Sequence, residues 1–141
     1  MGRAVAFMAP SPAADSFVAI AYVTGNAASR QDAEAIASLI GGGVQAGKIL
    51  LRPKLIDTSS LAAGGFAVVI AAAGANGPQL SAGAQGARAL CVTTEIAAVR
   101  AGLCAMAITS APRVQIVVNH AVSAAAGIEF AAAFRMMIRE I

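Results

Sequence analysis

The sequence predicts an α/β fold in which helices cover both faces of a doubly wound, mainly parallel sheet, giving three layers. Two observations lead to this prediction. Apolar segments of strand length alternate with segments of helical periodicity along most of the chain. Only 12% of the 141 residues are charged, against about 25% in an ordinary globular domain, as expected when strands are buried on both faces. A C-terminal antiparallel hairpin and a closing amphipathic helix complete the predicted fold.

The first predicted unit is a strand, a turn and a helix. Residues 17–24 are apolar and rich in β-branched side chains, which is typical of a strand buried on both faces. The glycine–asparagine pair 25–26 makes the turn. The helix that follows is expected to begin at Ser29, in a motif that resembles a capping box, and to continue to residue 40. The three glycines 41–43 then end it.

The next strand is predicted over residues 48–56 and is placed at an edge of the sheet. Pro53 has no N–H to donate to a neighbouring strand, which confines it to an edge. Three basic side chains, Lys48, Arg52 and Lys54, share one face of this strand. Basic residues on an edge discourage pairing with other chains, so we interpret this cluster as structural and not as a ligand site.

The remaining elements follow from the same patterns. In chain order they are a strand at 66–73, a helix at 79–88 after Pro78, a short strand at 89–94, a loop at 95–102, strands at 103–109 and 113–119, and a helix capped by Asn119 and ended by Gly127. The last two strands must form an antiparallel hairpin, because their link is too short for a parallel crossover. A closing helix at 128–141 is expected to carry one apolar stripe, formed by Phe130, Phe134, Met137, Ile138 and Ile141.

Composition excludes several classes of protein. The net charge of +3 comes from ten basic residues spread along the chain, without the basic and aromatic clusters of a nucleic-acid binder. No apolar run approaches the roughly 18 residues of a membrane span. The single histidine, His120, has no evident catalytic partner, and we expect no catalytic residues, metal site or cofactor. Cys91 and Cys104 are interpreted first as two buried thiols, with a disulfide between neighbouring strands as the alternative.

One loop invites a functional interpretation. Thr24, Gly25 and Asn26 resemble the phosphate loop of flavodoxins, but Ala27 stands where that loop needs a hydroxyl. A flavodoxin-like cofactor-binding protein is therefore the least favoured alternative. A receptor-like domain that binds a small ligand beyond the carboxyl ends of the strands, near 24–26, 73–76 and 93–95, is the second.

We expect a single domain over residues 1–141, in which residues 1–16 form a short N-terminal arm. The apolar stretch in this arm is shorter than the 7–15 residues of a signal-peptide core. As written, the chain therefore carries no complete export signal. Either the protein is cytosolic or the sequence begins after the true start, with a truncated arm.

The C-terminal third, GLCAMAITSAPRVQIVVNHAVSAAAGIEFAAAFRMMIRE, resembles the closing segment of the YfiR-like family of bacterial periplasmic regulators. The residues that carry the resemblance are Met106, Ile108, Arg113, Val114, Ile116, Asn119 and Gly127. Gln115 and Val117 depart from it, since the family often has charged or aromatic residues there.

The resemblance implies a small periplasmic homodimer that binds and represses the sensor region of a membrane-bound diguanylate cyclase. It would thereby lower cyclic-di-GMP signalling and biofilm formation, and export would favour oxidation of the two cysteines. The residues point separately to a non-enzymatic interaction protein, because a low surface charge without a reactive site is typical of a docking surface.

Overall fold

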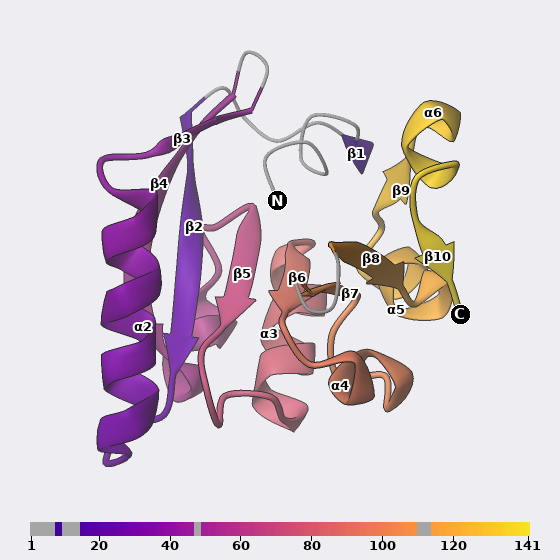
Figure 1. Ribbon diagram of the computed structural model, residues 1–141. Coiled ribbons are helices and arrows are strands. Elements are labelled where there is room, and N and C mark those ends of the chain that lie inside the picture. The colour runs from indigo at the N-terminus through magenta and orange to yellow at the C-terminus, as the bar shows by residue number, and fades with distance from the viewer. Residues whose placement is uncertain (1–7, 10–14, 47–48, 110–113) are drawn as a thin grey trace.

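The computed structural model describes residues 8–9, 15–46, 49–109 and 114–141. Within them, most strands belong to one eight-stranded sheet with helices on both faces, as predicted (Figure 1). The strands are β1 Met8–Ala9, β2 Asp15–Tyr22, β3 Val44–Ala46, β4 Ile49–Asp57, β5 Val68–Ala71, β6 Leu90–Thr93, β7 Met106–Thr109, β8 Gln115–Val118, β9 Glu129–Phe130 and β10 Arg139–Glu140. The helices are α2 Ala27–Ile40, the 3₁₀ helix η1 Thr58–Ala63, α3 Pro78–Ala87, α4 Ile96–Arg100, α5 His120–Ala125 and α6 Ala132–Arg135.

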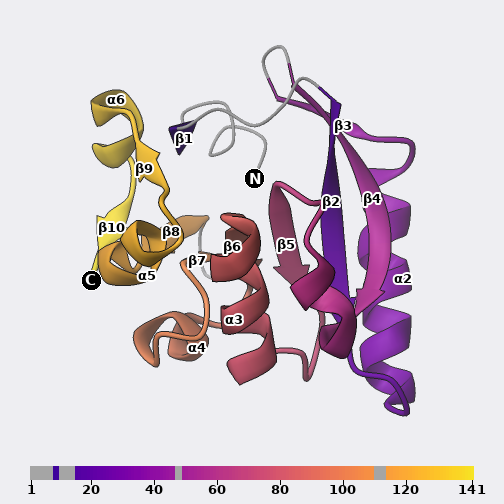
Figure 2. The ribbon, with the colours of Figure 1, turned by 180° about the vertical axis from the view of Figure 1, so that it is seen from behind.

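The sheet is mainly parallel and doubly wound. Its strand order is β10-β8-β7-β6-β5-β2-β4-β3, and five of the seven neighbouring pairs are parallel. The chain leaves β2 through α2 and enters β4, which lies next to β2 in the sheet. Strands β5, β6 and β7 are then added in turn beyond the opposite edge of β2. Right-handed crossovers in opposite directions place α2 on one face and η1, α3 and α4 on the other (Figures 1 and 2).

Two apolar clusters, one on each face of the sheet, form the core. The first packs α2 and the C-terminal segment against the sheet and includes Ile20, Leu51 and Phe134, none of which is exposed to solvent. The second lies beneath η1, α3 and α4 and includes Leu61 and Leu80. Strands covered on both faces explain the low fraction of charged residues.

The turn after β2 differs in detail from the prediction, because Asn26 and not Ser29 caps α2. The Asn26 side chain accepts a hydrogen bond from the Ser29 N–H at 3.1 Å. The Ser29 side chain is buried and its hydroxyl accepts from the Val23 N–H at 3.0 Å, so Ser29 ties the helix back to the strand. At the other end Gly41 has a φ of 65° and ends the helix, as predicted.

Strand β4 is not the edge strand that Pro53 predicted. The short strand β3 pairs antiparallel with residues 49–51 and forms the edge. Pro53 lies beyond these three residues and pairs with Val18 of β2 on its other side, so its missing N–H removes no bond of the β3 ladder. Arg52 and Lys54 are exposed as expected, and Lys48 lies outside the described residues.

The segment 128–141 is not the single helix that its apolar stripe predicted. It forms β9, the short helix α6 and β10, and β9 pairs antiparallel with β1. The competing interaction is the open edge of β8, where β10 adds in parallel and Ile141 N–H donates to Val118 O at 2.9 Å. Phe134 is nevertheless fully buried, so this position of the stripe was correctly assigned to the core. The predicted loop 95–102 likewise contains a helix, α4.

The hairpin and the helix after it are confirmed. Strands β7 and β8 pair antiparallel with Ile108 opposite Ile116, and the link 110–113 lies outside the described residues. Asn119 caps α5, and Gly127 has a φ of 75° just beyond it. No helix among the described residues is both long and apolar enough to cross a membrane.

The favoured interpretation of the cysteines as free thiols is wrong. Cys91 in β6 and Cys104, two residues before β7, form a disulfide. Since β6 and β7 are neighbouring parallel strands, their register brings the two positions to a Cα–Cα distance of 5.2 Å. That distance suits a disulfide bond.

Candidate functional site

The carboxyl ends of the parallel strands meet at one edge of the sheet, at the bottom of Figure 1. In open α/β sheets, ligands bind beyond these ends, at the point where the strand order reverses. Here that point lies between β2 and β5. The loop that the sequence singled out, Thr24, Gly25 and Asn26, follows β2, and Gly74 follows β5. The two loops touch, because a Cβ added at Gly74 would lie 3.3 Å from the Asn26 amide nitrogen.

Both hydrogen-bond donors of Thr24 are engaged within the protein. The backbone N–H of Thr24 donates to Asp57 Oδ2 at 2.8 Å, and the Thr24 hydroxyl donates to the same oxygen. The other carboxylate oxygen of Asp57 accepts from the backbone N–H of Ser59 at 2.7 Å and from its hydroxyl. Hydrogen bonds from Ser59 first and Thr24 second hold the pKa of the Asp57 carboxyl well below its usual range. A carboxylate thus occupies the donors of Thr24, and its negative charge disfavours an anion beside them.

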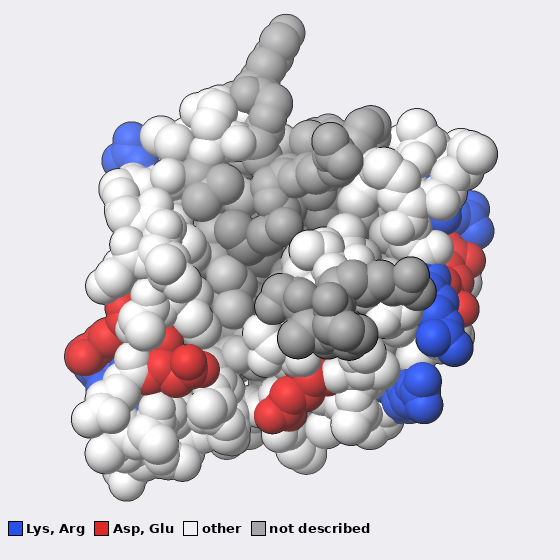
Figure 3. All heavy atoms as spheres, viewed as in Figure 1, with Lys and Arg blue, Asp and Glu red and all other residues white. Residues whose placement is uncertain are grey.

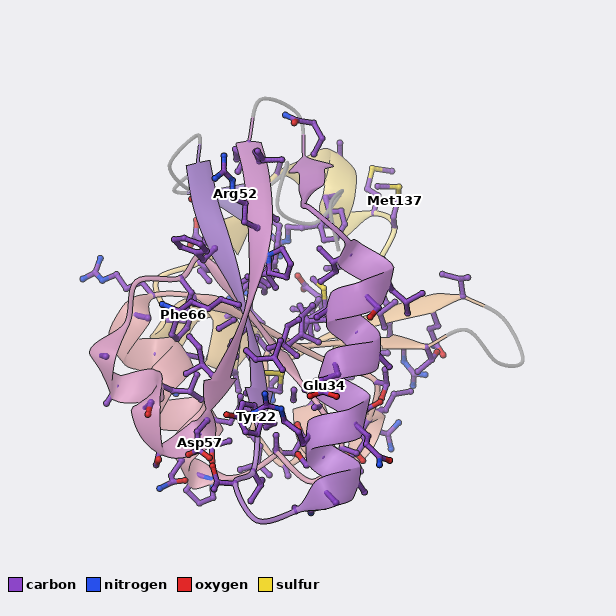
Figure 4. All side chains as sticks on the ribbon, turned by 90° about the vertical axis from the view of Figure 1, so that its left-hand side faces the viewer. Tyr22, Glu34, Arg52, Asp57, Phe66 and Met137 are labelled. Atoms are coloured by element: carbon purple, nitrogen blue, oxygen red, sulfur yellow. A yellow bond between two sulfur atoms is a disulfide. The ribbon has the colours of Figure 1, made fainter. Side chains whose placement is uncertain are left out.

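Further acidic groups surround this edge. Asp32 on α2 accepts a hydrogen bond from the Ala73 N–H at 2.7 Å and so ties the helix to the loop after β5. Glu34 pairs with Arg30 at 3.0 Å, and the Arg30 guanidinium lies 4.8 Å from the centre of the Tyr22 ring. Figure 3 shows acidic side chains over the lower half of α2 and in the region of α4, and Figure 4 shows Tyr22, Glu34 and Asp57 in the same lower part of the molecule.

A hollow of about 370 Å³ opens beside the first turn of α2. Its lining residues are Tyr22, Val23, Thr24, Gly25, Asn26, Ala27 and Arg30. The charged side chain among these lining residues is Arg30, which pairs with Glu34.

The loops after β5 and β6, at 73–76 and 93–95, are joined by Asn76. Its side-chain amide donates to Thr93 Oγ1 at 3.3 Å and to Glu95 Oε2 at 2.9 Å. Its carbonyl oxygen Oδ1 is buried and has no hydrogen-bond partner among the described residues. Buried polar atoms are rarely left unpaired. Oδ1 is thus an acceptor that the described residues leave without a donor.

A second candidate site lies at the edge of the sheet formed by the C-terminal strands, and six of its eight lining residues are apolar. A hollow of about 520 Å³ separates the start of β8 from the segment between α6 and β10. Its lining residues are Val114, Gln115, Ile116, Phe134, Met136, Met137, Ile138 and Arg139, and we call it the β8–β10 hollow. Val114 is 74% exposed, Met136 87% and Met137 48%. In Figure 4, Met137 lies at the end of the molecule opposite Asp57.

No pattern in the sequence indicated this hollow, because a continuous closing helix was expected to bury Met137 along its stripe. The residues that carry the resemblance to the YfiR-like family have two kinds of role in the structure. Val114 and Ile116 line the hollow, whereas Asn119 is structural: its side-chain amide donates to the Val99 carbonyl at 2.9 Å. Gly127 serves the turn after α5, and Arg113 lies outside the described residues.

His120 gives no support for nucleophilic catalysis at the start of α5. The nearby Ser123 hydroxyl donates to the backbone carbonyl of His120 at 3.1 Å and not to its ring. In the described part of the chain, no three side chains of the types His, Cys, Asp or Glu come together as metal ligands would.

A comparison with models of protein families finds none that matches this chain, and a comparison with curated proteins finds no match either.

Proposed function

We propose that the protein is a non-enzymatic regulator of the periplasm. It binds the sensor region of a membrane-bound diguanylate cyclase, represses it and so lowers cyclic-di-GMP signalling and biofilm formation. The observation that carries this proposal is the exposed apolar surface of the β8–β10 hollow, where Met136 is 87% exposed. Apolar side chains gathered on a surface are typical of protein interaction sites.

Three further features support the proposal. The C-terminal third carries the resemblance to the YfiR-like regulators, and two of its residues, Val114 and Ile116, line the same hollow. The Cys91–Cys104 disulfide suits an oxidising compartment such as the bacterial periplasm. Methionine side chains also suit a surface that must adapt to a partner, because they are unbranched and flexible.

The proposal is tested in cells and with purified proteins. Deleting the gene should raise the cellular level of cyclic-di-GMP, and restoring it from a plasmid should return the level to that of the wild type. The purified protein should bind the purified periplasmic region of a membrane-bound cyclase of its organism, and light scattering should report a homodimer. An unchanged cyclic-di-GMP level in the deletion strain, together with no binding, would refute the proposal.

A second candidate function is favoured by Asn76, whose buried Oδ1 has no partner among the described residues. A small ligand with a hydrogen-bond donor could bind beyond the carboxyl ends of the parallel strands, as in a periplasmic receptor domain. A thermal-shift screen of neutral and cationic metabolites tests this. A ligand at a hundred times its Kd should stabilise the protein by about 2.7 kcal/mol, and Asn76→Leu should abolish that shift.

A further inference from the structure

Among the described residues, strand pairing covers only half of the outer edge of β8. Strand β10 pairs with Val117 and Val118, and no described strand pairs with Gln115 and Ile116 on that side. The existing bonds show which residues face outward. Ile141 N–H donates to Val118 O across the outer edge, whereas Asn119 N–H donates to Ala105 O on the side of β7.

Backbone groups of successive residues in an antiparallel strand alternate between its two sides. Ile116, two residues before Val118, therefore turns its backbone toward the outer edge as well. The Ile116 N–H points toward this outer edge at a position that β10 does not cover, because β10 begins at Arg139, opposite Val117. An exposed strand edge of this kind is a template for another extended chain.

The open edge borders the β8–β10 hollow. Met136, Met137 and Ile138 form the opposite wall, and buried Phe134 also lines the hollow. The volume of about 520 Å³ lies within the range of ligand-binding pockets. Main-chain hydrogen bonds along an edge, together with apolar contacts for alternate side chains, are the two components of binding by strand addition.

The charge at the rim of the β8–β10 hollow indicates which kind of side chain the added strand should carry. Arg139 is exposed at the rim of the hollow, and within the described residues no acidic side chain pairs with it. The neighbouring Glu140 is already bonded to Arg135 at 3.1 Å. An acidic side chain on the incoming strand would find an uncompensated cation in Arg139.

We propose that the β8–β10 hollow binds an extended, apolar segment of a partner protein, which adds to the open edge of β8 and places an acidic side chain against Arg139. This inference rests on the proposed regulatory function and identifies the chemistry of the segment that is recognised. The strand addition lengthens the sheet beside the first half of β8, where β10 leaves it uncovered.

The test uses three full-length variants. Met136→Lys places a charge in the hollow, Arg139→Glu reverses the charge at its rim, and Leu39→Lys is the matched control. Leu39 is an exposed apolar residue of α2, 89% exposed, and lies outside the hollow. All three changes are at exposed positions, so the variants should melt at the temperature of the wild type. The probe is the purified periplasmic region of the cyclase.

Met136→Lys and Arg139→Glu should each weaken binding at least tenfold, while Leu39→Lys should bind like the wild type. A photo-crosslinking amino acid at position 136 should crosslink to a cyclase segment of alternating apolar residues that includes an acid. Replacing that acid by lysine should restore binding to Arg139→Glu.

If the wild type binds the cyclase and both hollow variants bind equally well, the strand-addition site is wrong and the regulatory function stands. A crosslink only to a second copy of the chain would also overturn the proposal. If the wild type itself does not bind, the regulatory function fails and the inference falls with it.

Discussion

Replacing both cysteines by alanine should lower the free energy of unfolding by about 3 kcal/mol. The disulfide joins residues 13 apart, and closing a loop of this length in the unfolded chain accounts for about 3 kcal/mol. Cys91 is 2% exposed and Cys104 is fully buried, so the lost sulfur atoms leave space in the core and add to the effect. For a chain of this size the melting temperature should fall by roughly 10 °C. Urea unfolding followed by circular dichroism measures the change.

A reductant supplies the control. Dithiothreitol should destabilise the wild type toward the level of the double variant, and it should leave the double variant unchanged. Equal stability of the oxidised wild type and the double variant would contradict the reasoning. So would mass spectrometry that found two free thiols in protein recovered from the periplasm, because the stabilisation is attributed to the covalent link.

Three further predictions concern single positions. Gly83→Ala should destabilise the protein by about 1–3 kcal/mol in urea unfolding, because the added Cβ would lie 2.5 Å from Leu61 Cβ. Gly86 lies in the same helix with open space around it, so Gly86→Ala is the control and should stabilise the protein by about 0.5–1 kcal/mol. Asn119→Ala removes the cap of α5 and should cost about 1 kcal/mol in the same assay, and no loss would show that the cap is unimportant. Asp57 stabilises the folded protein above the ordinary carboxyl pKa of 3.8, because its own pKa is lowered on folding. The stability difference between the wild type and Asp57→Ala should therefore be largest at neutral pH and shrink as the pH falls below 4, and a constant difference would exclude this role.

Local sequence patterns correctly predicted those elements whose burial or backbone conformation depends on their own residues. The continuous apolar segment 17–24 and the glycines after residue 40 correctly indicated β2 and the end of α2, because burial on both faces and a positive φ at Gly41 leave few alternatives. The hairpin was also correct, since its short link permits only one arrangement.

Interactions between distant segments account for what the sequence did not predict. The apolar stripe of 128–141 is compatible with a helix, but the pairing of β10 with β8 and of β9 with β1 decided the structure. Neither pairing leaves a pattern within the segment itself. The β8–β10 hollow exists because of this change, so its residues could not be identified as neighbours from their spacing.

The loop at Thr24–Asn26 illustrates the same limit at the other end of the sheet. Its sequence alone is compatible with a phosphate-binding turn, because a strand, a glycine and a capped helix are all present. The deciding residue is Asp57, at the end of a different strand, whose carboxylate accepts from both the N–H and the hydroxyl of Thr24. Only the parallel pairing of β2 with β4, which sets Tyr22 opposite Asp57, brings this acid to the loop. The register of β2 and β4 thus places a carboxylate beside a turn whose sequence resembles a phosphate-binding loop. The exposed apolar side chains of the β8–β10 hollow lie at the opposite end of the molecule.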